Sequence, residues 1–311
     1  MTTQPDEPRV ATLCAELAVL LARRTGSDGG HPTAIPELTF WRFSNPTEPA
    51  QVIQEPAVYV VVQGCKQVMV DGETYVYDPS QYLAVSLAVP AAGNVVKATP
   101  EVPYLCLTLQ VDPREIAGLL IETGQATPRD DHDGRALFVS ALEAPLLDAL
   151  LRLVRLLDAP ADIPVLAPLV LRELHYRLLQ SEQHGRFAEM AIGDGRLRRV
   201  AGAIAWIREH FAEPLQVEDL AKLASMSPST LHAHFRAVAG VSPIQYQKRL
   251  RLQEARRRLL TEDTSAEVVA YEVGYASASQ FSREYARLFG QPPRRDAEAM
   301  RADAAGGDAA S

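Results

Sequence analysis

The sequence predicts a protein of two domains, an N-terminal β-barrel with flanking helices and a C-terminal all-helical domain with a double helix-turn-helix. The chain has 311 residues, more than the roughly 250 that one hydrophobic core usually serves. Short β-rich runs fill residues 40–110, whereas apolar residues recur at helical spacing over residues 196–295. Charge changes sign between the two halves. We therefore expect domains at residues 1–192 and 193–295, and a disordered acidic tail at residues 296–311.

The charge is divided by domain. Residues 1–192 carry 14 Lys and Arg against 24 Asp and Glu, a net charge of −10. Residues 193–295 carry 16 against 11, a net charge of +5, and the tail carries 1 against 4. The charge of the whole chain, −8, argues against a polyanionic partner, but the basic domain taken alone favours one. Hydrophobic residues at 47% and charged residues at 23% exclude a disordered or fibrous chain.

Cysteine usage and hydropathy bear on the compartment. The three cysteines, Cys14, Cys65 and Cys106, are widely spaced, form no Cys-x-x-Cys pair and follow no signal peptide. The apolar stretch at residues 13–22 is interrupted by Glu16 and is too short to cross a bilayer. We therefore expect a cytoplasmic protein with no membrane partner.

The first domain is expected to open with a helix over residues 9–24. Six β-rich runs follow, at residues 57–63, 66–70, 74–77, 82–86, 94–98 and 104–110. Asp71-Gly72 lies between the second and third runs and predicts a type I′ hairpin turn. Short strands joined by short turns favour a barrel or jelly roll over a parallel sheet.

Helical spacing returns at residues 113–122, 144–157 and 165–180. The last two segments carry wide apolar stripes, which comprise Leu147, Leu150, Leu151, Val154 and Leu157, then Leu166, Leu169, Val170, Leu174 and Leu178. Such stripes either close the core of the domain or form a dimerisation surface, and the pattern fits both. Residues 184–195 are expected to form the linker.

The second domain contains an internal near-repeat with an offset of 50 residues. The matching positions are Ser227, Ser229, Leu231, Phe235, Gly240 and Pro243 in the first copy, and Ser277, Ser279, Phe281, Tyr285, Gly290 and Pro293 in the second. A short helix precedes each copy, at residues 217–225 and 266–273. Apolar positions 231, 235 and 238, and again 281, 285 and 288, fall on one face of a helix that is expected to be buried.

The opposite face of each helix carries small, polar or basic residues, as a major-groove reading helix does. These are Ser229, His232, Ala233 and Arg236 in the first copy, and Ala278, Ser279, Gln280, Ser282 and Arg283 in the second. The alternative is a helical bundle whose polar faces meet only water. Two copies with matching Ser, aromatic, Gly and Pro positions favour two helix-turn-helix motifs that bind double-stranded DNA.

A continuous helix over residues 243–260 is expected between the copies, with Pro243 in its first turn. It is strongly basic, with Lys248, Arg249, Arg251, Arg256, Arg257 and Arg258. The alternative is a solvated face, but six cations beside two reading helices favour phosphate contact, for which we single out Arg236, Lys248, Arg249 and Arg251.

These motifs resemble the DNA-binding domain of AraC/XylS-type transcriptional regulators. The segment at residues 270–285, continued by Phe289-Gly290 and Pro292-Pro293, is similar to the second helix-turn-helix of that family, and residues 220–243 are similar to the first. The resemblance implies base contacts at Ser229, His232, Ala233, Ala278, Ser279, Gln280, Ser282 and Arg283. One departure is Asp296, where the family often has an aromatic residue.

The first half resembles the N-terminal domain of AraC-type regulators, in residues 56–66, 75–79, 81–83 and 103–105. This implies a cupin-like barrel that senses a small-molecule effector of unknown identity and can mediate a homodimer. The family also implies RNA polymerase as a partner. A regulator that needs no ligand stays open as an alternative.

Five tyrosines could line an effector pocket in the barrel with apolar rings and polar tips: Tyr59, Tyr75, Tyr77, Tyr82 and Tyr104. Ordinary barrel core is the alternative for each of them. Cys65 is a possible sensor thiol, because the ammonium of Lys66 would lower its pKa if it lay close. A buried, inert cysteine is the alternative.

No catalytic residue, metal or cofactor is expected. Cupin metal sites use a His-x-His pair, and no histidine lies between His31 and His132. The alternative to a regulator is a cysteine-dependent or cupin-type enzyme fused to a DNA-binding module. Bound metal or one hyper-reactive thiol would distinguish that enzyme.

Overall fold

The computed structural model describes residues 7–125, 135–192, 196–262 and 264–308. The chain forms two compact units, residues 1–49 with 54–198, and residues 50–53 with 199–311. Within the described ranges, every helix is either too short or too polar to span a bilayer.

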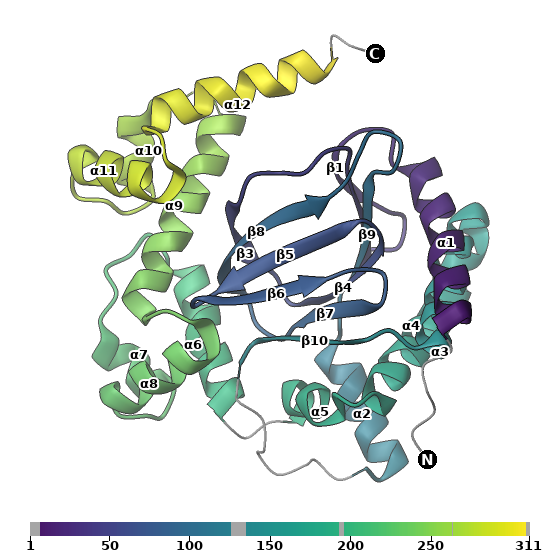
Figure 1. Cartoon of the computed structure of the whole chain (residues 1–311). Helices are drawn as coiled ribbons and strands as arrows, with labels where there is room; N and C mark the ends of the chain where they lie inside the picture. Colours follow the sequence, from purple (N-terminus) through teal and green to yellow (C-terminus); the bar gives the residue numbers. More distant parts are fainter. Residues whose placement is uncertain (1–6, 126–134, 193–195, 263, 309–311) are drawn as a thin grey trace. The chain divides into compact units, whose positions relative to one another are not determined.

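The first unit is built on two antiparallel sheets, stacked in Figure 1. The larger sheet has the order β1-β2-β9-β4-β7-β10, with strands Gly29–Pro32, Leu38–Phe43, Tyr104–Leu109, Ala57–Gln63, Gln81–Val85 and Leu137–Ala141. The smaller sheet has the order β3-β8-β5-β6, with strands Ala50–Gln54, Val89–Lys97, Cys65–Val70 and Glu73–Tyr77. Two sheets therefore form the predicted N-terminal β domain.

All six predicted strands are present, and the hairpin between β5 and β6 turns at Asp71-Gly72 with φ values of 49° and 80°. Positive φ at both positions is what a type I′ turn requires. Strands β1, β2, β3 and β10 were not predicted from the sequence. Of these, β10 lies far along the chain from β7, its partner in the sheet, so no hairpin signal marks it.

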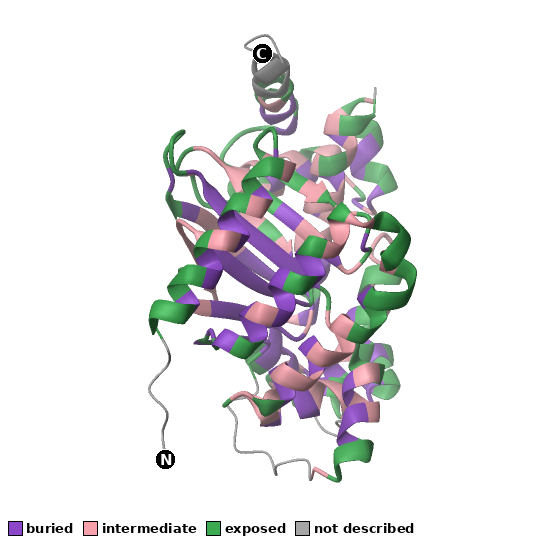
Figure 2. Ribbon diagram, turned by 90° about the vertical axis from the view of Figure 1, so that its right-hand side faces the viewer, coloured by how far each residue is buried: buried purple, intermediate pink, exposed green. Residues whose placement is uncertain are grey.

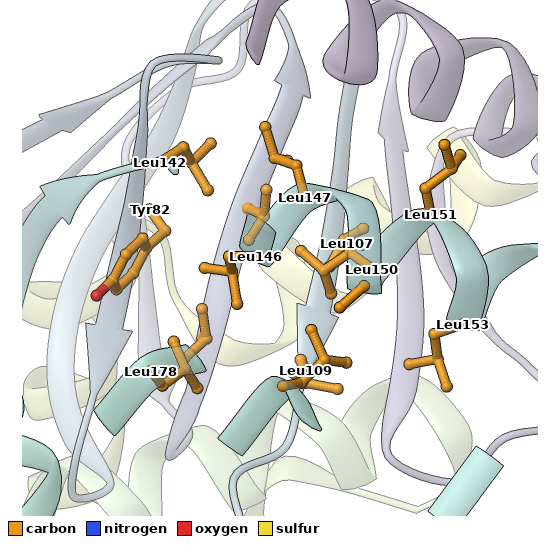
Figure 3. Close-up of a cluster of buried hydrophobic side chains, with 14 of the residues drawn as sticks. Tyr82, Leu107, Leu109, Leu142, Leu146, Leu147, Leu150, Leu151, Leu153 and Leu178 are labelled. Carbon is orange, nitrogen blue, oxygen red and sulfur yellow. The ribbon is translucent and has the colours of Figure 1, made fainter. Parts of the chain in front are cut away.

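Helices cover the outer face of the larger sheet. They are α1 (Glu7–Arg24), α2 (Pro113–Thr123), α3 (Ala144–Arg155) and α4 (Ile163–Gln180), with short 3-10 turns η1 (Leu156–Asp158) and η2 (Pro160–Asp162) after α3. Leucines of α3, including Leu147 and Leu150, pack against Leu107 and Leu109 of β9 (Figure 3). The strands beneath are largely buried and the outward faces of these helices are exposed (Figure 2).

The apolar stripe on α4 has two parts. Leu174 and Leu178 are fully buried in the core of the unit, whereas Leu166 and Leu169 are 40% and 62% exposed. The stripe on α3 is buried apart from Leu157, which lies beyond the helix and is half-buried. The α3 stripe therefore closes the core, and only the first turns of α4 leave an apolar surface.

The segment expected as a linker is a helix in its described part. Residues His184–Ile192 form α5, and Phe187 and Ala188 are fully buried in the core of the first unit. The ring of Phe187 lies edge-on to that of Phe138 at 5.5 Å between centroids. The linker prediction was wrong there because this apolar pair belongs to the core, and residues 193–195 lie outside the described ranges.

Apart from residues 50–53, which belong to strand β3, the described part of the second unit is helical. Its helices are α6 (Arg196–Glu209), α7 (Val217–Leu223), α8 (Pro228–Ala239), α9 (Pro243–Thr261), α10 (Ala266–Glu272), α11 (Ala278–Phe289) and α12 (Pro293–Asp308). Helix α9 is the predicted connecting helix, and α8 and α11 are the predicted reading helices (Figure 1).

The expected disordered tail at residues 296–311 is helical as far as Asp308, because α12 runs through its start. Asp296 is only 6% exposed and Ala297 only 7%. Arg256 of α9 and Tyr285 of α11 both bind the Asp296 carboxylate, and this anchors the first turn of α12. The tail prediction was wrong for residues 296–308, and residues 309–311 lie outside the described ranges.

Candidate functional site

The two reading helices are built and capped alike. Each begins after a serine, and the side chains of Ser227 and Ser277 accept the backbone N–H of Thr230 and Gln280. Each ends at a left-handed glycine, Gly240 or Gly290. Serine satisfies a free N–H at a helix start, and glycine tolerates positive φ at a helix end. The caps therefore set α8 and α11 exactly 50 residues apart along the chain.

One face of each reading helix is anchored in the unit, as the spacing predicted. Leu231, Phe235 and Val238 of α8 are at most 2% exposed, and Phe281 and Tyr285 of α11 are fully buried. Leu288 is only half-buried. Phe235 meets Tyr246 of α9 edge-on with 5.6 Å between centroids.

The turn before each reading helix is tight and left-handed. Ser225 has φ 52° and Gly274 has φ 93°, and the residue after each donates its N–H five residues back, to Ala221 or Ala270. These turns are 49 residues apart, so the second copy has one extra residue, Ala276, before its capping serine. The repeat is therefore not exact.

The eight predicted base contacts lie on the free faces of these helices or at their starts. Ser229, Ala233, Ser279, Gln280 and Arg283 are exposed, and His232, Ala278 and Ser282 are half-buried. Arg236, predicted to contact phosphate, is also exposed. Among the described residues, neither Arg236 nor Arg283 forms an ion pair, so both guanidinium groups are available to an external anion.

Arg251, predicted to contact phosphate, is bound to three backbone carbonyls, and the phosphate contact stays a prediction. Its Nε donates to the carbonyl of Phe211 at 2.6 Å, Nη1 to Gly274 at 2.8 Å and Nη2 to Glu213 at 2.8 Å. Burial lowers the pKa of this guanidinium. Arg251 therefore joins the segment before α7 to the turn before α11. Sequence could not show this, because backbone carbonyls carry no residue signature.

Lys248, also predicted to contact phosphate, is exposed but already paired. Its Nζ lies 2.9 Å from Oε1 of Glu284 on α11. Arg249, the remaining candidate on α9, is half-buried. The contacts predicted for Lys248 and Arg249 stay predictions.

The last three cations of α9 pair within the unit. Arg257 and Arg258 both bind Glu254, which holds the pKa of that carboxyl near 2. Arg256 binds Asp296 through Nε at 2.8 Å and Nη2 at 3.1 Å. The cations of α9 therefore take part in an ion-pair network within the unit, which the charge count alone could not show, and the phosphate contacts expected of this helix stay predictions.

The buried acid on α12 is the feature that the sequence analysis missed. The hydroxyl of Tyr285 donates to Oδ2 of Asp296 at 2.7 Å, beside the guanidinium of Arg256. The same guanidinium lies 4.5 Å from the centroid of the Phe289 ring. The sequence did contain one indication of this contact, because Asp296 replaces the aromatic residue that the family often has, in a domain with an arginine-rich helix.

In the first unit, the inner face of the smaller sheet carries a cation. The register places Lys66 opposite Tyr77 on β6 and Val95 on β8. Tyr77 and Val95 are 1% exposed, whereas the next side chains, Val76 and Val96, are 51% and 45% exposed. Because side chains alternate along a strand, Lys66 points into the space between the sheets.

Polar groups from both sheets lie near this cation. Tyr104 and Cys106 lie on the face of β9 away from the helices, and Cys106 and Lys66 affect each other's pKa. The hydroxyls of Tyr77 and Tyr104 are buried without a well-formed hydrogen bond to a described residue, although each lies close enough to affect the pKa of the other. Burial raises the pKa of both. Burial lowers the pKa of Lys66, for which no described residue supplies a counter-charge within 4 Å.

One of the five predicted pocket tyrosines lies elsewhere. Tyr82 belongs to the core between the larger sheet and the helices (Figure 3), with its hydroxyl 3.4 Å from Oγ of Ser181. Tyr75 shares the inner face of β6 with Tyr77, is half-buried, and its hydroxyl accepts from Arg135 at 3.5 Å. Tyr82 therefore cannot line a pocket between the sheets, because strand alternation turns it to the opposite face.

The sensor role expected for Cys65 stays a prediction, but Lys66 does not supply the activating charge. Burial and Asp78 raise its pKa, and the cation that opposes them is Lys97 on β8, not Lys66. Neighbouring side chains of a strand point to opposite faces, so Lys66 cannot activate it. Cys14 and Cys106 are buried, and burial raises the pKa of each to about 11.

No group of three or more His, Cys, Asp or Glu side chains suited to a metal ion occurs among the residues that the structure describes.

Comparison with known proteins relates both units to one family. Residues 34–186 match the model of the AraC-type transcriptional regulator N-terminus, and residues 220–299 match a helix-turn-helix domain. Among curated relatives, the transcriptional activator RhaS of Escherichia fergusonii is 38% identical over 101 residues, 32% of this chain and 35% of that protein. RhaS of Pectobacterium atrosepticum is 33% identical over 138 residues, 44% of this chain and 47% of that protein.

Among solved structures, ToxT from Vibrio cholerae bound to (E)-4-(8-methylnaphthalen-1-yl)but-3-enoic acid superposes with a TM-score of 0.59. That match is 11% identical and covers 83% of this chain and 96% of ToxT. Another ToxT structure, with an unsaturated fatty acid bound, gives a TM-score of 0.55 at 10% identity over 82% of this chain and 92% of that one. These likenesses confirm the two-domain fold. The chain spans about a third to a half of the length of the curated relatives that it matches.

Proposed function

This chain belongs to the AraC/XylS-type transcriptional regulators, and from that membership we propose that it regulates transcription by binding specific DNA sequences under the control of a small-molecule effector. The observation that carries the proposal is the matched pair of capped helices, α8 and α11, each anchored on one face and polar on the other. Such helices fit the major groove, where base edges differ in donors and acceptors.

Arg283 offers the direct test of this proposal. Replacing it with alanine is expected to weaken binding to the selected DNA site by about 1–3 kcal/mol and to relax the preference at one base pair, because a guanidinium reads guanine through two hydrogen bonds. Sites are first selected from a random double-stranded library with the full chain, and affinities are then measured by fluorescence anisotropy.

Arg294→Ala is the matched control, because the Arg294 side chain is 87% exposed in the same unit and pairs with Glu298 on its own helix. It should leave the selected motif unchanged. Failure of the full chain to enrich any sequence would refute sequence-specific binding, whereas an unchanged motif for Arg283→Ala would remove only this residue from the readout.

The effector is proposed to be an anion that binds between the two sheets. Lys66 supports this, because its ammonium points inward without a counter-charge from the described residues, near the unpartnered hydroxyls of Tyr77 and Tyr104. Lys66 is half-buried, and a cation drawn partly out of water is stabilised by an opposite charge. Hydroxyl groups can donate to a carboxylate. The surrounding Val68 and Val95 would favour an apolar body on that anion.

Octanoate and octanamide, which share one shape and differ in charge, probe this site. Octanoate is expected to raise the melting temperature of the full chain by at least about 2 °C, and octanamide is not. Lys66→Met should abolish the rise, and the control Lys97→Met should keep it, because Lys97 is exposed on β8. Equal effects of acid and amide, or an undiminished effect in Lys66→Met, would contradict an anionic effector.

Two partners are proposed on narrower grounds. Exposed Val165, Leu166 and Leu169 on α4 support a second copy of the chain as a partner, since an apolar helix face is usually covered. RNA polymerase is proposed from family membership alone. A cysteine-dependent enzyme is not proposed, because Cys14 and Cys106 are buried and Lys66 does not lie on the side of β5 that carries Cys65.

A further inference from the structure

Gln280 is tied to a carboxylate on its own helix. Its Nε2 donates to Oε1 of Glu284, one turn further along α11, at 3.1 Å. Gln280 is exposed on the first turn of the helix, where a reading helix meets base edges. This contact can therefore affect which DNA base the amide recognises.

Three donors hold the Glu284 carboxylate in place. Besides Gln280, Oε1 accepts from Nζ of Lys248 at 2.9 Å, and Oε2 accepts from the hydroxyl of Tyr275 at 2.9 Å. Tyr275 is 6% exposed and its ring packs against Phe281 with 5.3 Å between centroids. The Glu284 side chain is only 25% exposed. It is therefore a fixed acceptor, unlike a pair of mobile surface side chains.

A fixed carboxylate dictates the orientation of the amide beside it. An ionised carboxylate can only accept hydrogen bonds, and its hydrogen-bond donors lower the pKa of Glu284, which keeps it ionised at neutral pH. The NH2 group of Gln280 must then face Glu284, because the flipped amide would set oxygen against oxygen. The carbonyl oxygen Oε1 of Gln280 is left to point toward whatever meets the helix.

We infer that Glu284 is a positioning residue for sequence readout, and that it makes Gln280 select a base with an amino group in the major groove. The inference rests on the proposed function. Adenine and cytosine offer an amino donor to an outward carbonyl oxygen, whereas guanine and thymine present acceptor oxygens there. Adenine is favoured, because the second amide hydrogen of Gln280 stays free for its N7.

The test is base selection by the full chain and four variants. Sites are selected from a random double-stranded library with the unaltered chain, Gln280→Ala, Glu284→Gln, the double variant and Glu298→Gln. Gln280→Ala identifies the base pair that Gln280 reads, which should be adenine, or secondarily cytosine, on one strand. Glu284→Gln keeps the shape of the side chain, but the new amide can either donate a hydrogen bond to Gln280 or accept one from it. The orientation of Gln280 is then no longer fixed, so the preference for that base should fall roughly threefold or more.

The double variant of Gln280→Ala and Glu284→Gln shows whether Glu284 acts by positioning Gln280 or by maintaining the structure of the helix. If Glu284 acts through Gln280, its substitution should have no further effect on that base pair once Gln280 is alanine. Glu298→Gln removes the same charge from an exposed site on α12 and should leave the preference intact.

The outcomes distinguish failure of the role inferred for Glu284 from failure of sequence-specific DNA binding. Guanine or thymine at the Gln280-dependent position, or an undiminished preference in Glu284→Gln, would overturn this inference while sequence-specific binding stands. An equal change in Glu298→Gln would also overturn it. Failure of the unaltered chain to select any sequence would overturn the proposed function and this inference together.

Discussion

Gly274→Ala is expected to lower the free energy of unfolding of the second unit by about 3 kcal/mol or more. Although the substitution adds only one methyl group, this is the largest effect that we predict. Gly274 has φ 93°, which alanine adopts only with strain. A Cβ there would lie 2.1 Å from the carbonyl oxygen of Ala212 and 2.9 Å from Cζ of Arg251. Both neighbours are fixed, because Arg251 donates to backbone carbonyls around this turn.

Urea unfolding followed by circular dichroism measures this loss, and Gly290→Ala is the matched control. Gly290 has φ 81°, but a Cβ there would meet nothing within 4 Å. Gly290→Ala should lower the free energy of unfolding only by the strain of the backbone, about 1 kcal/mol. Equal losses in the two variants would show that the close approach to Ala212 does not matter.

Asp296→Ala is expected to cost about 3 kcal/mol, the second large effect. The substitution leaves the guanidinium of Arg256 without its two-point partner and the fully buried hydroxyl of Tyr285 without an acceptor. A buried donor or charge that loses its partner is penalised far more than an exposed one. Arg256 is a quarter exposed, so the loss should stay below that of a fully buried pair.

Glu298→Ala is the control for this second prediction. Its carboxylate is 61% exposed and pairs with Arg294 at 2.9 Å on the same helix, so its loss should cost about 0.5 kcal/mol. Both variants are compared by urea unfolding at the same protein concentration. A loss for Asp296→Ala as small as that of the control would mean that α12 is not anchored through this acid.

Local signals predicted most of the elements but few of the side-chain roles. Helices α8 and α11 could be predicted because serine caps, glycine ends and apolar spacing lie within each segment. The roles of the α9 cations could not, because their partners come from other elements: Asp296 lies 40 residues from Arg256, and Glu284 lies 36 residues from Lys248. A count of charges cannot tell a cation that is paired internally from one that is available to DNA.

The first unit shows the same limit. The strands that contain Tyr77, Tyr82 and Tyr104 were predicted, but tyrosine content alone could not say which face each ring occupies. Alternation along the strand would have separated Cys65 from Lys66, since adjacent side chains point to opposite faces. The inward cation at Lys66 needed the register of β5 against β6 and β8.

The Arg251 contacts have a consequence for the DNA that the protein can recognise. One guanidinium binds carbonyls on both sides of the second unit, two in the segment before the first helix-turn-helix and one in the turn of the second. We therefore expect the two reading helices to shift together rather than separately. If the chain binds DNA as proposed, the number of base pairs between the two segments that one protomer reads should be constant, and effector binding should change the affinity for DNA but not this spacing.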